Sequence, residues 1–140
     1  LPLAPRRSYV GRHGGLDEKL VENTPVENSL VCECEEVSDG EVKYALNELD
    51  VHNLVDLRRR TRVGMGTCQG ELCACRAAGV MSAEGKYCTR RAKEDLASFL
   101  NERWKGMAPI AWGDTLRESE YTAWVYESVC GLKLPQKQEE

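Results

Sequence analysis

Apolar residues recur at helical intervals along much of this chain. Ser38 and Glu41 have the spacing of a capping box, which places a helix N-terminus at Ser38. The apolar stripe that follows consists of Val42, Ala45, Leu46 and Leu49. Intervals of three and four residues put these side chains on one face, so the pattern predicts an amphipathic helix after Ser38.

Two further helices are predicted on either side of a glycine-rich segment. The first starts at Asn53 and ends in the basic run 58–62. The second begins near Gln69 and continues to about Val80. It would place Cys68 at a helix N-terminus, where the helix dipole stabilises a thiolate.

The chain beyond residue 80 is predicted to continue mainly as helices. A polar connection at 81–92 precedes an amphipathic segment over 94–104. Pro109 and two glycines predict a loop over 105–113, and residues 118–129 are helix-like again. No alternation typical of a long strand occurs. The predicted fold class is therefore all-α, a small helix–turn–helix domain with extra C-terminal helices.

Composition narrows the class of protein. The chain has 140 residues, 41% of them hydrophobic, which is enough for a core and argues against wholesale disorder. Its net charge of -4 argues against non-specific nucleic-acid binding. No apolar run is long enough to predict a membrane-spanning helix. The first residues, LPLAPRRSYVGRHGG, contain no apolar stretch and do not begin with Met, so we expect a piece of a longer protein without a signal peptide.

Seven cysteines are the main chemical feature of the sequence. Five of them form two tight groups, a C-x-C pair at Cys32 and Cys34 and a C-x4-C-x-C group at Cys68, Cys73 and Cys75. The odd number and close spacing are unlike a disulfide scaffold, and a Cys32–Cys34 disulfide would close a strained small ring. We therefore predict that the two groups converge on one metal centre.

The residues alone leave open which metal binds. Zinc sites usually pair their ligands as C-x2-4-C, so the single residue between Cys32 and Cys34 is short for zinc. A [2Fe–2S] cluster needs four thiolates, two for each iron, which one pair from each loop would supply. Glycines in the segment 63–70 let backbone amides approach sulfur closely, which favours the iron–sulfur alternative. An ordinary glycine turn is the other interpretation of that segment.

The two cysteine segments resemble a known family. VCECEEVSDGEV and LRRRTRVGMGTCQGELCAC are similar to the BFD-like [2Fe–2S] domain, named for bacterioferritin-associated ferredoxin. The resemblance implies a small all-helical domain at 30–82 that holds one cluster. The ligands that it implies are Cys32, Cys34, Cys68 and Cys73. This chain has C-x4-C where bacterioferritin-associated ferredoxin has C-x2-C, and Cys75 lies outside the four-ligand pattern as a possible alternative ligand.

Residues beside the cysteines in sequence are candidates for tuning such a cluster. Those expected to approach or hydrogen-bond the ligands are Gly64, Gly66, Thr67 and Gln69. The candidates for offsetting the negative charge of a reduced cluster are Arg59, Arg62 and Arg76. The alternative for the arginines is a solvated helix end favoured by its dipole. We expect Glu33, Glu35 and Glu36 to be exposed charges and not metal ligands.

Sequence outside the cysteine segments narrows the resemblance further. LPLAPRRSYVGRHGGLDEKLVENTP and FLNERWKGMAPIAWGDTLRESEYTAWVYESVCGL look like the C-terminal region of the A-subunit of the anaerobic glycerol-3-phosphate dehydrogenases. This implies that 1–29 is a linker or the tail of an upstream FAD domain, and that 83–140 is a C-terminal helical extension. The FAD domain itself is not expected within this chain, because no G-x-G-x-x-G occurs.

The second resemblance implies a function in electron transfer. In that family the FAD domain oxidises sn-glycerol 3-phosphate to dihydroxyacetone phosphate, and electrons pass through subunits B and C to menaquinone. The chain would then relay electrons from the flavin through its cluster and would carry no catalytic residues of its own. The implied location is cytoplasmic, at the inner face of the membrane, with membrane contact only through partner subunits and no nucleic-acid partner.

Two other functions stay open. Four thiolates could hold zinc in a structural interaction module, or copper(I) in a metal- or thiol-handling regulatory module. No Ser/His/Asp or Cys/His arrangement supports hydrolysis, and His13 and His52 do not fit a Rieske site. We expect Cys88 and Cys130 to be free thiols. The aromatic residues expected to anchor the core or an interface are Trp104, Trp112, Tyr121 and Trp124.

Overall fold

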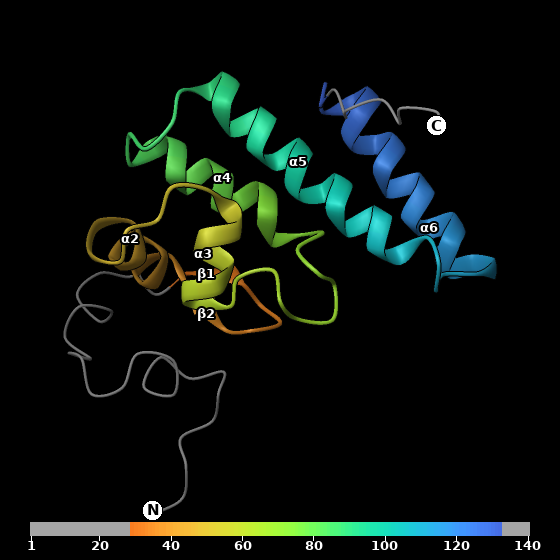
Figure 1. The fold of residues 1–140 in the computed structure, drawn as a ribbon, viewed down its shortest axis with the longest axis horizontal. Helices are drawn as coiled ribbons and strands as arrows, with labels where there is room; N and C mark the ends of the chain where they lie inside the picture. The colour runs from red at the N-terminus through yellow and green to blue at the C-terminus, as the bar shows by residue number, and fades with distance from the viewer. Residues whose placement is uncertain (1–28, 133–140) are drawn as a thin grey trace, which may run out of the picture.

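The structure is a computed structural model, and it describes residues 29–132. The predicted linker or upstream tail at 1–29, apart from Ser29, and the predicted polar end at 133–140 lie outside the described residues. Within the described part, the helices α2 to α6 pack with a small β-hairpin (Figure 1).

A β-hairpin opens the described chain. Strand β1 (Leu30–Cys32) pairs antiparallel with β2 (Val37–Ser38), and the buried side chains of Val31 and Val37 anchor it in the core. The all-α prediction is therefore correct only in part, because the fold is mainly helical with a two-stranded sheet. Strands of three and two residues are too short to show the period-two alternation by which strands are recognised.

Helices α2 and α3 begin where the sequence predicts, and the structure shows that each has a side-chain N-cap. In α2 (Asp39–Glu48) the Ser38 hydroxyl accepts a hydrogen bond from the Glu41 amide at 3.2 Å. In α3 (Leu54–Thr61) the Asn53 side chain accepts from the Asp56 amide at 2.8 Å. Each bond satisfies an amide that the first helical turn leaves free, so both predicted N-termini are confirmed.

Helix α4 (Cys73–Ala83) begins four residues later than predicted. Gln69 and Gly70 adopt positive φ angles of 50° and 89°, which a right-handed helix does not accommodate. The chain therefore turns between Cys68 and Cys73 before it becomes helical. As a result Cys73, and not Cys68, lies at the helix N-terminus.

The C-terminal helices are longer than the sequence pattern indicates. Helix α5 (Thr89–Met107) extends beyond the predicted 94–104 at both ends, so the connection from α4 covers only 84–88. Helix α6 (Gly113–Trp124) starts five residues before the predicted 118 and passes into a π-helical turn, η2 (Val125–Val129). The first turns of α5 and α6 are mostly polar, which leaves the hydrophobic pattern without a signal there.

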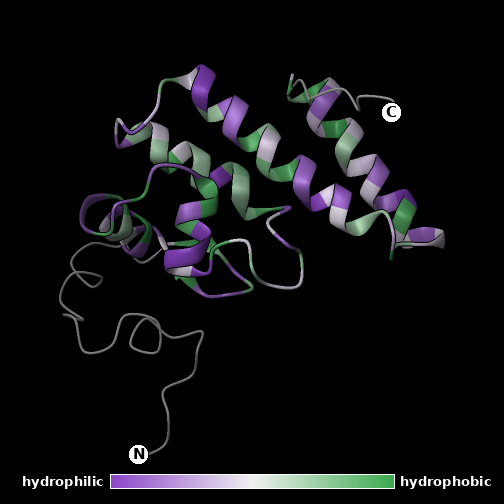
Figure 2. Cartoon of the chain, in the orientation of Figure 1, coloured by the Kyte–Doolittle hydropathy of each residue, from purple (hydrophilic) through white to green (hydrophobic). Residues whose placement is uncertain are grey.

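Helix α5 lies between α4 and α6 (Figure 1). Its buried residues Leu96, Phe99 and Leu100 pack toward the alanine-rich face of α4 and toward α3. Figure 2 shows α5 alternating between hydrophilic and hydrophobic residues along its length, as expected for a helix with one face in the core. Helix α6 contributes no buried residue. Across residues 29–132, no helix is both long enough and apolar enough to span a bilayer.

Candidate metal centre

Four cysteines meet where the hairpin faces the start of α4. Cys32 ends β1, and Cys34 follows it in the hairpin turn. Cys68 lies in the loop after α3, and Cys73 is the first residue of α4. Contacts of β1 with α4 bring these two parts of the chain together, although residues 35–67 separate them in sequence.

The four sulfur atoms form two close pairs. The sulfur atoms of Cys34 and Cys68 are 3.7 Å apart, and the thiols of Cys32 and Cys73 are hydrogen-bonded to each other. Two sulfur ligands at ~2.3 Å from a tetrahedral ion lie ~3.8 Å apart, so the Cys34–Cys68 distance suits two ligands of one metal. Within residues 29–132, no three or more His, Cys, Asp or Glu side chains lie close enough to bind a single ion.

The two pairs differ in their exposure to solvent. Cys32 and Cys73 are buried, with 1% and 2% of their surface exposed, whereas Cys34 and Cys68 are half-buried. One pair therefore lies in the core and the other near the surface. A group bound by both pairs would span the distance from the core to the surface.

Hydrogen bonds favour a negative charge on the buried pair, Cys32 and Cys73. The hydrogen bond from Cys73 lowers the pKa of Cys32 to about 6, against the opposing effect of burial, and the Gly64, Glu35 and Cys34 amides lower it further. The same bond, burial and the nearby charge of Cys32 raise the pKa of Cys73. The hydrogen bond from Cys73 and the backbone amides thus both favour a thiolate at Cys32. This environment suits ligands that must bind as thiolates.

The glycines of the loop allow its close approach to the sulfur atoms. A Cβ atom on Gly66 would lie 2.3 Å from Cys34 Cβ, so no side chain fits at that position. Gly64 has a φ of 77°, and its amide donates to the sulfur atoms of both Cys32 and Cys73. Gly66 therefore permits close packing against Cys34, and Gly64 donates to the buried sulfur atoms. An ordinary turn would not require either contact.

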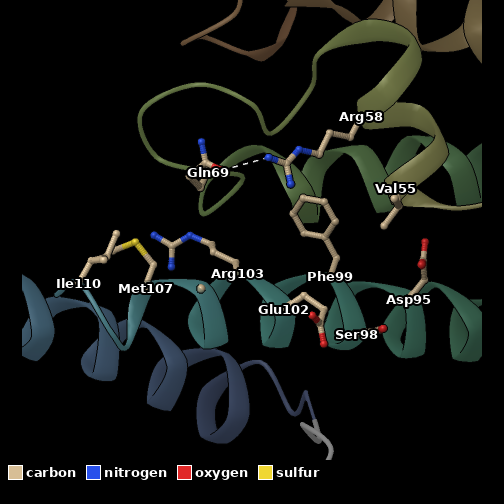
Figure 3. Close-up of a pocket in the computed structure, with 11 residues that line it drawn as sticks. Val55, Arg58, Gln69, Asp95, Ser98, Phe99, Glu102, Arg103, Met107 and Ile110 are labelled. Carbon is tan, nitrogen blue, oxygen red and sulfur yellow. Dashed lines mark hydrogen bonds between the residues drawn. The ribbon is translucent and has the colours of Figure 1, made fainter.

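Gln69 stabilises this loop by hydrogen bonds from its side chain to the loop backbone. Gln69 Nε2 donates to the carbonyl oxygens of Met65 at 3.2 Å and Gly66 at 2.9 Å. Arg58 Nη2 in turn donates to Gln69 Oε1 at 3.0 Å, and its guanidinium lies over the Phe99 ring (Figure 3). Gln69 thus contacts the loop backbone and not a sulfur atom.

Thr67 lies directly against a cysteine. Its hydroxyl is 3.9 Å from Cys34 Sγ, within the range of a hydrogen bond to sulfur. Cys34 belongs to the pair nearer the surface, so the hydroxyl provides that sulfur with a donor that the buried pair obtains from backbone amides.

The three arginines singled out from the sequence lie in different environments. Arg76 donates to Glu33 at 2.8 Å, and its pKa is raised by that carboxylate first and also by the charges of Cys73 and Cys32. Arg62 donates to Glu35 at 2.7 Å. The third, Arg59, is exposed and lies 3.8 Å from Asp56. Arg76 is therefore the arginine with an electrostatic interaction with the cysteines.

The expectation that the glutamates near the first cysteine pair are exposed charges is wrong for Glu35. Only 4% of its surface is exposed, and its carboxylate forms the ion pair with Arg62 at 2.7 Å. A buried carboxylate requires such a partner. The hairpin turn folds Glu35 inward toward the end of α3, which residue order alone does not indicate.

The remaining cysteines lie apart from the two pairs. Cys75 is exposed, because two residues along a helix turn a side chain about 200° away from Cys73. Cys88 and Cys130 are exposed and form no disulfide. His52 is an exposed residue that lies 2.9 Å from Asp50, and His13 lies outside the described residues.

Sequence reasoning missed residues that are far from the cysteine loop in sequence but contact it in the fold. Arg103 on α5 donates to the Cys68 carbonyl oxygen at 3.1 Å. Glu71, inside the loop, accepts bonds from Arg103 and from two residues of the last helices. No local motif marks these residues, because they are brought together only by the packing of α5 and α6.

A cavity of about 370 Å³ is lined by residues of α3, of α5 and of the loop that contains Gln69 (Figure 3). Arg58, Gln69, Phe99 and Arg103 are among its lining residues, and none of the cysteines is. The Nε atom of Arg58 and the Nη1 atom of Arg103 are buried without a hydrogen-bond partner. These atoms have no exposed surface, so they do not present donors to a molecule in the cavity.

Comparison with known proteins confirms both resemblances. Residues 30–82 match the BFD-like [2Fe-2S] binding domain family. The chain is 57% identical over 98% of its length to the A-subunit of the anaerobic glycerol-3-phosphate dehydrogenase of Escherichia coli K12. It is 56% identical over 94% of its length to the corresponding protein of Haemophilus influenzae. It spans only about a quarter of these relatives, 25% and 23% of their lengths.

A shorter match links the chain to a differently named protein. The hydrogen cyanide synthase subunit HcnB of Pseudomonas aeruginosa is 44% identical over 33% of this chain. No solved structure matches. Homology over nearly the whole chain is therefore to the dehydrogenase subunits, which include the region of α5 and α6.

Proposed function

We propose that this chain is the electron-transfer segment of an anaerobic glycerol-3-phosphate dehydrogenase and holds a [2Fe–2S] cluster. The observation that carries the proposal is the arrangement of four thiols as two close pairs at the junction of the hairpin and α4. Two ligands for each iron is what such a cluster requires. The match of residues 30–82 to a family of [2Fe–2S] binding domains supports the same assignment.

The proposed ligands are Cys32, Cys34, Cys68 and Cys73. Cys32 and Cys73 would hold the iron in the core, and Cys34 and Cys68 the iron near the surface. Cys75 is not included, since it is exposed on the other side of α4.

A bound [2Fe–2S] cluster supplies one-electron redox chemistry. The residues of this chain would offset the negative charge that accompanies it. Amides of Gly64 and the hairpin turn donate to Cys32, Thr67 donates to Cys34, and Arg76 lies within electrostatic reach of Cys73. Arg62 and Arg76 are each paired with a glutamate, but Arg76 also interacts electrostatically with Cys73 and Cys32, so it is the stronger candidate for charge compensation.

The rest of the enzyme enters the proposal through the homologous subunits. An FAD domain upstream would oxidise sn-glycerol 3-phosphate to dihydroxyacetone phosphate, and the two electrons would leave the flavin one at a time through this chain. Subunits B and C would accept them and reduce menaquinone. The segment would then be located on the cytoplasmic face of the membrane through those subunits.

Exposed aromatic residues suggest where the remainder of the enzyme docks. Trp112, Tyr121 and Trp124 have 81%, 63% and 59% of their surface exposed along α6 and the loop before it. Aromatic side chains are enriched in protein interfaces. Of the predicted anchors, Trp104 alone packs against the core, where it contacts Tyr126. We propose that the other three contact the FAD domain.

Absorption and EPR spectra of the anaerobically purified chain, before and after dithionite, test the proposal. We expect two irons, two sulfides and a one-electron EPR signal. The signal should be lost in Cys73→Ser and retained in the matched control Cys75→Ser, which alters an exposed thiol on the same helix. A colourless chain that binds one zinc or copper(I), and forms no chromophore when supplied with iron and sulfide, would contradict the proposal and favour one of the other two functions.

A further inference from the structure

The loop between Cys68 and Cys73 is held from outside by α5. Arg103 donates from Nε to the Cys68 carbonyl oxygen at 3.1 Å and from Nη2 to Glu71 Oε2 at 3.0 Å. Its side chain is only 8% exposed. A guanidinium presents these donors in one rigid plane, so Arg103 fixes two points of the loop relative to each other.

Helix α6 and η2 complete the same network. The Thr122 hydroxyl donates to Glu71 Oε1 at 2.6 Å, and the Tyr126 hydroxyl donates to the Glu71 carbonyl oxygen at 2.7 Å. The Glu71 carboxylate therefore accepts hydrogen bonds from α5 and α6, and its backbone carbonyl oxygen accepts one from η2. Tyr126 is itself held by its ring contact with Trp104 of α5.

We infer that Glu71, Arg103, Thr122 and Tyr126 position Cys68 for metal binding, which makes α5 and α6 a functional part of the metal centre. All but Glu71 lie beyond the segment 30–82 that matches the domain family. Four residues separate Cys68 from Cys73, two of them with positive φ, and no regular secondary structure holds that loop. The hydrogen bonds of these four residues restrain the loop in place of regular secondary structure. They thereby hold the Cys68 sulfur 3.7 Å from the Cys34 sulfur.

The inference concerns positioning, because none of the four residues contacts a cysteine sulfur. Arg103 acts on the Cys68 backbone, and Thr122 and Tyr126 act on Glu71. Groups that orient metal ligands typically change metal affinity by about tenfold to a hundredfold when removed. The expected effect on metal affinity rests on the proposed function. The hydrogen-bond network around Glu71 can be tested on its own in the metal-free chain.

The test uses the full chain with the double substitution Thr122→Val and Tyr126→Phe, which deletes two hydroxyls and keeps side-chain volume. We expect loss of the iron–sulfur chromophore to a chelator to become at least about tenfold faster. Amide exchange at 68–72 in the metal-free chain should accelerate as well. Thr122→Ser, which keeps a hydroxyl, should be closer to the unsubstituted chain. Thr115→Val, at an exposed position of the same helix, should change neither rate.

Two different results separate this inference from the proposed function. If the unsubstituted chain assembles no cluster, the proposed function fails, and amide exchange at 68–72 alone decides the network. If the cluster assembles but the double variant matches Thr115→Val in both rates, the network does not position the loop. Arg103→Lys, which cannot bridge Cys68 and Glu71 in the same way, provides a second variant should the double variant fail to fold.

Discussion

At the level of single residues, the proposed metal centre depends on Gly66 as well as on its cysteines. The backbone there lies so close to the hairpin turn that a Cβ atom would come within 2.3 Å of Cys34 Cβ. Both atoms belong to short, constrained segments, so neither can yield without moving a cysteine. The absence of a side chain is therefore part of the site.

We predict that Gly66→Ala displaces Cys34 from Cys68 and sharply reduces the iron and sulfide bound per chain. Metal analysis and EPR of the reduced protein measure this effect. Gly79→Ala is the matched control, since Gly79 lies in α4 with no atom within 4 Å of the added Cβ. The control should bind a full cluster and gain about 0.5–1 kcal/mol in stability, because alanine is the better residue within a helix. A full cluster in Gly66→Ala would contradict the prediction.

Among the secondary-structure elements, α3 leads into the loop that contains Cys68 and depends on its N-cap. The Asn53 side chain accepts from the Asp56 amide, and the Asp95 carboxylate of α5 accepts from the Leu54 amide at 2.8 Å. Asp95 also accepts from the Tyr87 hydroxyl at 2.6 Å. The first turn of α3 is thus held both by its own cap and by α5.

We predict that Asn53→Ala lowers the free energy of unfolding by about 1 kcal/mol, the usual effect of losing a side-chain cap. Urea denaturation of the metal-free chain measures it. Asn47→Ala is the control, because Asn47 is exposed within α2, where alanine has the higher helix propensity. It should be neutral or slightly stabilising. Equal destabilisation by both substitutions would show that the cap does not explain the effect.

Across the molecule as a whole, Tyr126 links the C-terminal helices to the loop between Cys68 and Cys73, through its bond to the Glu71 carbonyl oxygen. Burial first, and then the nearby negative charges of cysteines and Glu71, raise its pKa to about 12. The ordinary value for tyrosine is about 10. The folded state therefore holds this proton more tightly than the unfolded state does. The stability it contributes is present below pH ~10 and is lost as the pH rises toward ~12.

We predict that Tyr126→Phe destabilises the chain at neutral pH and that this difference shrinks between pH ~10 and ~12. The phenylalanine variant has no proton to lose, so its urea midpoint should fall less steeply over that range. Measuring the midpoint of both chains against pH gives the result. Two parallel curves would mean that the Tyr126 hydroxyl does not ionise with unfolding.

The features that follow from residue order alone are local ones. The cysteine spacing, the glycines and the caps at Ser38 and Asn53 act over a few residues, so they can be read in order along the chain. They predict two helix N-termini, the two cysteine groups that the structure brings together and the glycine loop beside them. The choice of four of the five cysteines in those groups came from the resemblance to the BFD-like domain.

Tertiary packing set the features that depend on contacts between distant segments. The hairpin was too short for a periodic signal, and the positive φ angles at Gln69 and Gly70 delayed α4 until Cys73. The ion pair that buries Glu35 and the network around Glu71 join residues separated by 27 to 55 positions. Such partners share no local pattern, because packing and burial choose them only after the helices have formed.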